Sequence, residues 1–244
     1  MNKKYIFKDA ETVCIAAADY IVELSKKTIS KKGKFTIALS GGNTPRKLYE
    51  LLAQPAYSSL LEWKNIFVFW GDERYVPLSD ENNNSHMAFA ALLNNIPIPA
   101  ENIFTVPVNF GPERAAISYE QTLLTFFKES IPAFDLILLG IGTNGHTASL
   151  FPFTPILKEK KQLVKEIFIE ELGMYRISFT ATLINQAHHI LFLVTGKEKA
   201  AIIQTIFSGV KEGEKYPVLL IKPVKVDPAW YIDEAAASGI KAAT

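Results

Sequence analysis

The sequence contains a single cysteine, Cys14, and this scarcity excludes several classes of protein. One thiol cannot form a disulfide within the chain, and it cannot build a cysteine-based metal cluster. No uninterrupted apolar run approaches the roughly 18 residues that a membrane-spanning helix needs. The apolar run at the amino terminus ends at Lys8 and Asp9 and is too short for a signal peptide. We therefore expect a cytoplasmic protein with no membrane partner, in which Cys14 packs as a small core hydrophobe.

An excess of charge of either sign is also lacking. The 26 basic and 25 acidic residues leave a formal net charge of +1, so the sequence has no electrostatic footprint for nucleic acid. Apolar residues make up 48% of the 244 residues, enough for a substantial core. No linker-like, low-complexity or repeated segment divides the chain. We expect one α/β domain spanning residues 1–244, present as a monomer or weak homo-oligomer.

Helical and strand-like patterns alternate along the chain. This alternation is typical of a doubly wound, Rossmann-like fold, with a mostly parallel sheet and helices on both faces. Apolar runs predict strands at 35–39, 66–70, 134–139 and 190–194. The pattern of residues predicts helices at 9–30, from a first turn containing Pro45 through residue 53, at about 84–94, at about 112–130, and from 197 through 207. Weaker patterns indicate a pair of strands at 163–170 and 174–180, and short strands at 218–221 and 229–232.

The most informative segment follows the strand predicted at 134–139. It reads Gly-Ile-Gly-Thr-Asn-Gly-His-Thr-Ala-Ser-Leu-Phe-Pro from residue 140 onward, and its three glycines within six residues let the backbone turn sharply. The turn presents His146 at the carboxyl end of a strand, where open α/β sheets bind ligands. Histidine is well matched to proton transfer near neutral pH. The alternative is an ordinary strand–turn–helix corner whose histidine only caps or packs.

A second polar loop follows the strand predicted at 35–39 and reads Ser-Gly-Gly-Asn-Thr-Pro-Arg. Gly41 and Gly42 allow backbone amides to approach an anion, and Asn43, Thr44 and Arg46 supply further donors. The loop matches neither the phosphate loop of ATPases nor a dinucleotide fingerprint, so no nucleotide cofactor is expected. A glycine-rich turn with a threonine or asparagine cap is the alternative.

A third polar loop follows the strand predicted at 66–70. Arg74 can bind an anion in a bidentate manner or stabilise developing negative charge, and Asp72 can orient a base or accept hydrogen bonds from a ligand. An exposed turn with weak salt bridges is the alternative. No recognised zinc-ligand spacing accompanies these loops, so no metal is expected.

The histidine segment resembles the Gly-Asp-Gly-His-Thr-Ala-Ser-Leu-Phe-Pro signature of the 6-phosphogluconolactonase family. Asn144 stands where that family usually has aspartate, and an amide cannot carry the charge that would stabilise a protonated histidine. The Asp-Glu-Arg run ending at Arg74 resembles the family too. Asn84, Arg176 and Lys199 match further family positions, and the resemblance covers roughly residues 9–237.

The resemblance implies hydrolysis of 6-phospho-D-glucono-1,5-lactone to 6-phospho-D-gluconate in the oxidative pentose phosphate pathway. His146 would activate water, and Arg74 would stabilise the oxyanion. Arg46 and Lys199, with the glycine loop, would bind the phosphate. Asp72, Asn84, Asn144 and Arg176 complete the expected site, and no cofactor is implied.

Two alternatives stay open at this point. Glucosamine-6-phosphate deaminases share the phosphate-binding loop, but their Gly-His motif continues to Asn-Glu-Pro, where this chain has Leu150, Phe151 and Pro152. A non-catalytic sugar-phosphate sensor is the other alternative. Residues 1–34 leave room for only one amphipathic helix before the first predicted strand, so a separate DNA-binding segment is not expected.

Overall fold

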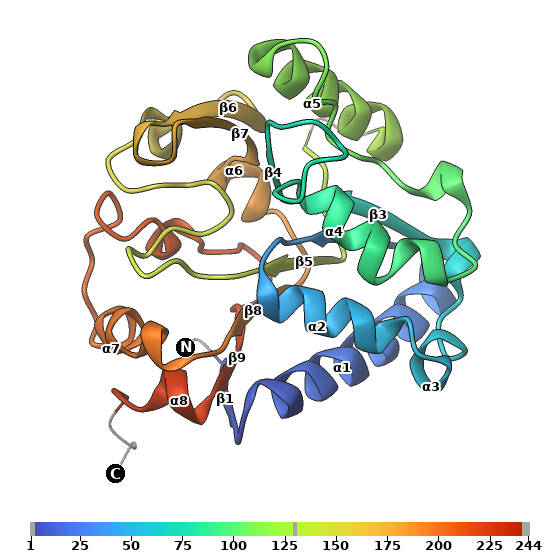
Figure 1. The fold of residues 1–244 in the computed structure, drawn as a ribbon, viewed down its shortest axis with the longest axis horizontal. Helices are drawn as coiled ribbons and strands as arrows, with labels where there is room; N and C mark the ends of the chain where they lie inside the picture. The colour runs from blue at the N-terminus through green and yellow to red at the C-terminus, as the bar shows by residue number, and fades with distance from the viewer. Residues whose placement is uncertain (1–2, 129–130, 241–244) are drawn as a thin grey trace.

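Two β-sheets organise residues 3–128 and 131–240, the parts of the chain that the computed structural model describes (Figure 1). The larger sheet has six parallel strands, in the order β1 (Lys3–Phe7), β9 (Ala229–Asp233), β8 (Ile190–Val194), β5 (Leu136–Leu139), β2 (Phe35–Leu39) and β3 (Ile66–Trp70). The smaller sheet is antiparallel, in the order β4 (Asp72–Arg74), β7 (Met174–Phe179) and β6 (Val164–Ile169). The predicted α/β class is confirmed.

Helices of very different lengths connect these strands. The α-helices are α1 (Ala10–Lys32), α2 (Asn43–Leu52), α3 (Pro55–Ser58), α4 (Asn84–Ala91), α5 (Pro112–Phe127), α6 (Ala181–Ile184), α7 (Ala200–Phe207) and α8 (Glu234–Ala237). Short 3-10 helices are η1 (Trp63–Asn65), η2 (Leu93–Asn95), η3 (Ala100–Asn102), η4 (Pro155–Lys158), η5 (Glu170–Leu172), η6 (Lys197–Lys199) and η7 (Pro217–Leu220). No helix in the described segments is both long and apolar enough to cross a membrane.

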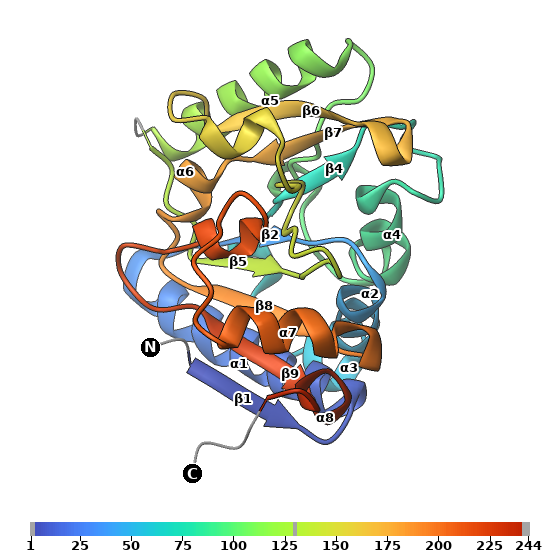
Figure 2. The same ribbon diagram turned by 90° about the vertical axis from the view of Figure 1, so that its left-hand side faces the viewer.

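Helices cover both faces of the larger sheet (Figure 2). The connection from β1 through α1 to β2 crosses the sheet in one direction, and the connection from β8 through α7 to β9 crosses it in the other. Because such crossovers are right-handed, α1 and α7 lie on opposite faces. The direction in which the connections cross the sheet reverses between β2 and β5. At such a switch point, a ligand crevice is expected outside the carboxyl ends of the two strands.

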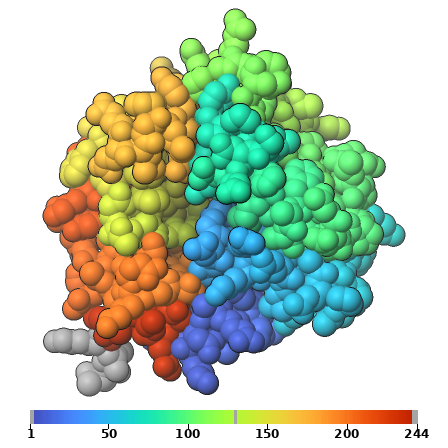
Figure 3. All heavy atoms as spheres, viewed as in Figure 1, coloured from blue at the N-terminus to red at the C-terminus, as the bar shows by residue number. Residues whose placement is uncertain are grey.

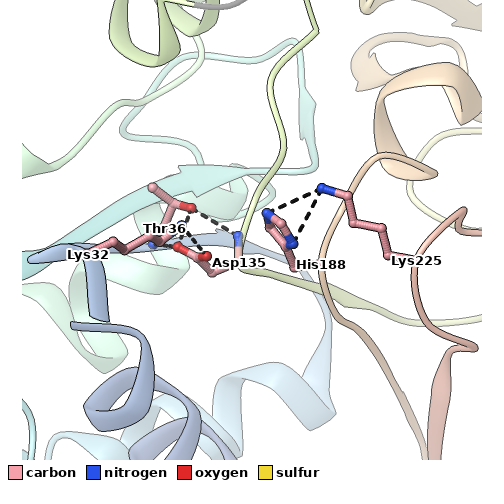
Figure 4. Close-up of polar contacts among 5 residues, drawn as sticks. All are labelled: Lys32, Thr36, Asp135, His188 and Lys225. Carbon is pink, nitrogen blue, oxygen red and sulfur yellow. Dashed lines mark hydrogen bonds and ion pairs between the residues drawn. The ribbon is translucent and has the colours of Figure 1, made fainter. Parts of the chain in front are cut away.

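The opposite end of the same two strands is fastened by a buried acid (Figure 4). Asp135, just before β5, accepts hydrogen bonds from the backbone N–H and the hydroxyl of Thr36 on β2, at 2.8 and 2.9 Å. Lys32 at the end of α1 forms an ion pair with the same carboxylate at 2.5 Å. Nearby, Lys225 Nζ lies 3.5 Å from the ring nitrogens of His188. The hydrogen bonds of Asp135 to Thr36 join the start of β5 to β2, and its ion pair with Lys32 adds α1 to the same point.

Most predicted elements are confirmed, and the exceptions have physical causes. Residues 218–221 do not form a strand, because Pro217 starts a 3-10 turn in which the Leu219 N–H donates to Tyr216 O at 2.9 Å. Lys128 adopts a left-handed conformation that ends α5 at Phe127, and residues 129–130 of that predicted helix lie outside the described residues. The sequence reading missed β1 and β4 entirely.

Candidate active site

A cleft of about 410 Å³ opens at the switch point between β2 and β5. In Figure 3 the surfaces of the loop after β2 (blue), of β4 (teal) and of the loop after β5 (yellow-green) meet near the centre of the face. The residues predicted for the site that line this cleft are Gly41, Gly42, Asp72, Arg74, Asn84, Asn144, His146, Arg176 and Lys199. A larger hollow of about 730 Å³ lies along α5 and Phe104 and contains none of these residues.

Two buried tyrosines fix the points where the chain leaves the sheet to form the cleft. The Tyr49 hydroxyl on α2 donates to the carbonyl of Ser40 at 2.8 Å and accepts from its N–H at 3.0 Å. Tyr119 on α5 holds Trp70 at the end of β3 in the same way, at 3.1 and 2.8 Å. Each hydroxyl satisfies two backbone groups that a strand end would otherwise leave unpaired. The loops that carry the site therefore start from fixed positions.

Gly41 and Asn84 approach each other closely on one wall of the cleft. A Cβ atom at Gly41 would lie 2.0 Å from Asn84 Oδ1, so any larger residue there would displace the Asn84 side chain. Asn84 is 2% exposed, and its Nδ2 donates to the carbonyl of Asp72 at 2.9 Å. Its Oδ1 has no hydrogen-bond partner among the described residues. Because an unpaired buried acceptor costs about 1–3 kcal/mol, a hydroxyl donated by a ligand would be favoured here.

Two arginines face each other across the small sheet. Arg74 on β4 and Arg176 on β7 are register partners, so their side chains share one face. Arg74 donates to the carbonyl of Asn82 at 2.5 Å, whereas the buried Nε of Arg176 has no partner in the described structure. Burial is the main cause that lowers the pKa of Arg176, and the charge of Arg74 lowers it further, whereas the carboxylates of Asp72 and Glu73 act in the opposite direction. Together with Lys199, this pair makes the cleft strongly attractive to an anion.

Glu73 lies beneath the arginine pair and is 0% exposed. Its Oε1 accepts from the N–H groups of Arg74 and Asn84, at 2.8 and 2.6 Å, and its Oε2 accepts from the N–H and hydroxyl of Ser85, both at 2.8 Å. Burial raises the pKa of Glu73 to about 7, and these hydrogen bonds oppose the rise. The carboxylate thus ties β4 to the start of α4 and holds Arg74 and Asn84 in the cleft wall.

Asp72 connects the small sheet to the histidine loop. Its Oδ2 accepts from the hydroxyl of Ser149 at 2.6 Å, and the Ser149 N–H donates to the hydroxyl of Ser178 on β7 at 3.1 Å. Both serines are buried. The contact orients the Asp72 carboxylate and fixes the loop after β5 against β4 and β7.

The imidazole of His146 is held on three sides. Its Nδ1 lies 2.7 Å from Oδ1 of Asn144, and the same oxygen accepts from the backbone N–H of His146 at 3.1 Å. The ring of Phe151 stacks on the imidazole with the centroids 4.1 Å apart and the planes 14° apart. A Cβ atom at Gly142 would lie 2.1 Å from His146 Nδ1, so glycine is required there as well. The imidazole has little freedom to turn away from this position.

The surroundings of His146 keep it neutral. Burial is the main cause that lowers its pKa from 6.5 to about 4, and the positive charges of Arg176, Lys199 and Arg74 lower it further. The carboxylate of Asp72 acts in the opposite direction. At neutral pH the ring therefore carries no charge and has a nitrogen that can accept a proton.

Lys199 belongs to η6, and the loop before η6 is fastened from two sides. The Gly196 N–H donates to both carboxylate oxygens of Asp233, at 3.1 and 3.0 Å. The hydroxyls of Thr195 and Thr44 lie 2.6 Å apart, which joins the loop after β8 to the loop after β2. The contact fixes the loop that leads to Lys199 beside the glycine loop that follows β2.

Three residues predicted for the site are not in the lining of the cleft. Arg46 has its side chain 63% exposed and paired with Glu50 at 3.0 Å, on the outer side of α2. Asn43 is exposed, and Thr44 contacts Thr195 instead. Helix α2 starts at Asn43 and has Pro45 in its first turn, as predicted, and Arg46 projects beside Glu50 at helical i, i+4 spacing.

Sequence reasoning missed residues that reach the cleft through long-range pairing. Glu171 and Leu172 line it from η5, the short helix between β6 and β7. Their position depends on the antiparallel pairing of β7 with β4, for which the sequence carries no local signal. No group of three or more histidine, cysteine, aspartate or glutamate side chains in the described residues is arranged to hold a metal ion.

Comparison with known families decides the assignment of the chain. The family model described as glucosamine-6-phosphate isomerases/6-phosphogluconolactonase matches residues 8–230, which include every loop of the cleft. The chain belongs to this family.

Named relatives within the family are similar over nearly the whole chain. The 6-phosphogluconolactonase of Synechocystis sp. is 43% identical over 219 residues, covering 88% of each chain. That of Nostoc sp. is 39% identical over 235 residues, covering 95% of each. Among solved structures, the 6-phosphogluconolactonase from Trypanosoma cruzi superposes with a TM-score of 0.87 at 27% identity, covering 99% of this chain and 98% of that one.

Proposed function

We propose that the protein is a 6-phosphogluconolactonase, which hydrolyses 6-phospho-D-glucono-1,5-lactone to 6-phospho-D-gluconate in the oxidative pentose phosphate pathway. The relatives that match most of the chain carry that name. The observation that carries the proposal is a neutral imidazole fixed beside three cationic side chains in one cleft. That combination suits a substrate with a phosphate at one end and a carbonyl that needs water activation at the other.

The phosphate of the substrate binds where the cationic groups converge. Lys199 and Arg176 offer charge-assisted donors, and the backbone at Gly41 and Gly42 opens the adjacent wall of the cleft. A phosphate oxygen would satisfy the buried Arg176 Nε that has no protein partner in the described structure. Binding this remote anion positions the lactone carbonyl and converts binding energy into orientation.

His146 acts as the general base. It takes a proton from the water molecule that attacks C1 of the lactone, and a tetrahedral oxyanion forms. Arg74 stabilises the negative charge that develops on the oxygen, and Asp72 stabilises the imidazolium. The C1–O5 bond then breaks, and the proton held by His146 passes to the departing ring oxygen. The product is an open-chain acid that ionises at neutral pH.

Phe151 favours hydrolysis over deamination of an amino sugar. The motif of the deaminases has glutamate at this position, whereas Phe151 is 7% exposed and stacks on His146. An apolar ring there leaves the cleft without a carboxyl group at that side of the imidazole. The same ring excludes water from one face of the base.

A pH-controlled assay on freshly prepared lactone tests the proposal. We expect acid release well above an enzyme-free blank, and no ammonia release from glucosamine 6-phosphate. Ammonia release without lactone hydrolysis would make the protein a deaminase. Binding of 6-phosphogluconate with neither turnover would make it a sugar-phosphate sensor.

We further propose that the enzyme works in the cytoplasm as one domain, residues 1–244, in a monomer or weak homo-oligomer. No cofactor, membrane or nucleic-acid partner is proposed. Each charged group that the mechanism uses comes from this chain, because Asp72, Arg74, His146, Arg176 and Lys199 all line one cleft. Sedimentation of the purified chain at several concentrations tests the oligomeric state.

A further inference from the structure

The contact between Asn144 and His146 shows which ring nitrogen of His146 carries the hydrogen. An amide side chain presents either an oxygen, which accepts, or an NH2 group, which donates. The atom of Asn144 that faces the ring also lies 3.1 Å from the backbone N–H of His146, which can only donate. That atom must therefore be the oxygen. At 2.7 Å from it, Nδ1 of the imidazole must carry the hydrogen.

We propose that Asn144 is a positioning residue that holds His146 in the neutral tautomer with its proton on Nδ1, leaving Nε2 free to deprotonate water. The inference rests on the proposed function of His146 as a base. The tautomer of a histidine is set by the hydrogen bond of its other ring nitrogen, and a base needs a bare nitrogen facing its substrate.

Contacts around Asn144 and His146 hold the two side chains in this arrangement. A Cβ atom at Gly142 would lie 2.1 Å from His146 Nδ1 and 2.9 Å from Asn144 Oδ1, so this glycine makes room for the pair. Phe151 stacks on the ring and restricts its rotation. The Gly142 N–H donates to the carbonyl of His146 at 2.8 Å, which closes the loop around both residues.

The amide also sets the charge around the base. The charged groups that act on His146 are Asp72 and Arg74 on β4, Arg176 on β7 and Lys199 on η6. Three of these four are cationic, and Asn144 adds no negative charge to offset them. An aspartate at position 144 would keep the acceptor and add a charge, which stabilises the imidazolium.

Three variants test the proposal in the full-length enzyme. In Asn144→Leu the side chain keeps its size but loses the acceptor. We expect kcat to fall by at least about tenfold, and by no more than the roughly 10²–10⁴-fold loss that removes a general base altogether. The KM should stay within about twofold, because Asn144 acts through His146. In Asn144→Asp we expect kcat to be retained at neutral pH and its acid limb to move up by about 1–3 pH units.

The double variant Asn144→Leu/His146→Ala separates positioning from a structural role. If Asn144 acts through the imidazole, the leucine substitution causes no further loss of kcat in the His146→Ala background. An equal loss in both backgrounds would overturn the proposal. So would an unchanged kcat in Asn144→Leu alone.

Nitrogen NMR of the labelled enzyme gives a readout that does not depend on turnover. We expect His146, assigned by the loss of its signals in His146→Ala, to show a protonated Nδ1 and a bare Nε2 at neutral pH. A proton on Nε2 would overturn the inference even in an active lactonase. Conversely, a preparation without lactonase activity that shows the expected tautomer would refute the proposed function and leave the positioning role intact.

Discussion

The low pKa of His146 predicts that the enzyme keeps its activity in mildly acidic solution. An ordinary histidine with a pKa of 6.5 is about nine-tenths protonated at pH 5.5, and an enzyme that depends on it loses about tenfold in kcat. With a pKa of about 4, only about one-thirtieth of His146 is protonated at that pH. The reason is structural, since burial and the positive charges of Arg176, Lys199 and Arg74 all oppose the imidazolium.

The assay is kcat at saturating lactone between pH 4 and 8, with the spontaneous hydrolysis subtracted at each pH. Values of kcat are preferred because the substrate phosphate itself titrates near pH 6 and affects binding. We expect kcat at pH 5.5 to stay within about twofold of its value at pH 7, with the acid limb near pH 4. An acid limb at pH 6.5 or above would refute the argument that burial and charge keep the base neutral.

Three further variants test the phosphate site, the position of the base and the packing of the sheet. Lys199→Ala should raise KM for the lactone by about tenfold or more and leave kcat little changed, because the variant loses a donor to the phosphate. Lys197→Ala is the matched control, because Lys197 is exposed, and it should change neither KM nor kcat. Gly142→Ala should lower kcat towards the level of a variant without the base, because its methyl group would displace His146. Asp135→Ala should lower the free energy of unfolding in urea by about 3 kcal/mol, because it leaves the Thr36 N–H unpaired and breaks the ion pair to α1.

Each of these outcomes has a contradicting result. Equal KM values for the Lys199 and Lys197 variants would remove Lys199 from the phosphate site. Normal turnover in Gly142→Ala would mean that the histidine does not need its present position. An unfolding midpoint unchanged by Asp135→Ala would mean that the fastening of β2 to β5 contributes nothing to stability.

The protonation of His146 also links stability to pH. The pKa is lower in the folded state than in the unfolded state, so the unfolded chain binds the proton first as the pH falls. The resulting loss of stability sets in below about pH 6.5 and is complete near pH 4, and it amounts to about 2–4 kcal/mol. His146→Ala should lose less stability over this interval in urea titrations. An identical pH dependence of the two proteins would contradict the shifted pKa.

The parts of the fold that sequence reasoning predicted are those with strong local patterns. The apolar runs of β2, β3, β5 and β8 are buried along their whole length, or nearly so, and such strands read as continuous hydrophobic stretches. The sequence pattern did not predict strand β1, because β1 is an edge strand with mostly exposed side chains. Strand β4 is three polar residues long and exists only through its pairing with β7.

The residues of the site likewise fall into those that local sequence patterns predict and those that depend on distant contacts. Gly41 and Asp72 come just after apolar strands in the sequence, and His146 lies in the glycine-rich loop that follows a third, so the carboxyl ends of these strands bring them together at the switch point. Arg46 lies on the face of α2 that also carries Glu50, and the sequence pattern does not show that this face lies outside the cleft. The supporting roles of Glu73 and Asp233 were not predicted, because they depend on hydrogen bonds to Asn84 and Gly196, which lie in other elements of the fold.

The central claim is that a neutral imidazole, fixed beside a cationic pocket, activates water on a phosphorylated lactone. The most direct test compares the intact enzyme with His146→Ala in two measurements, the rate of acid release from the lactone and the affinity for 6-phosphogluconate. The account predicts a rate lower by about 10²–10⁴-fold, with an affinity within a few-fold of the intact enzyme. A variant that hydrolyses the lactone at a nearly normal rate while binding the product normally would contradict it.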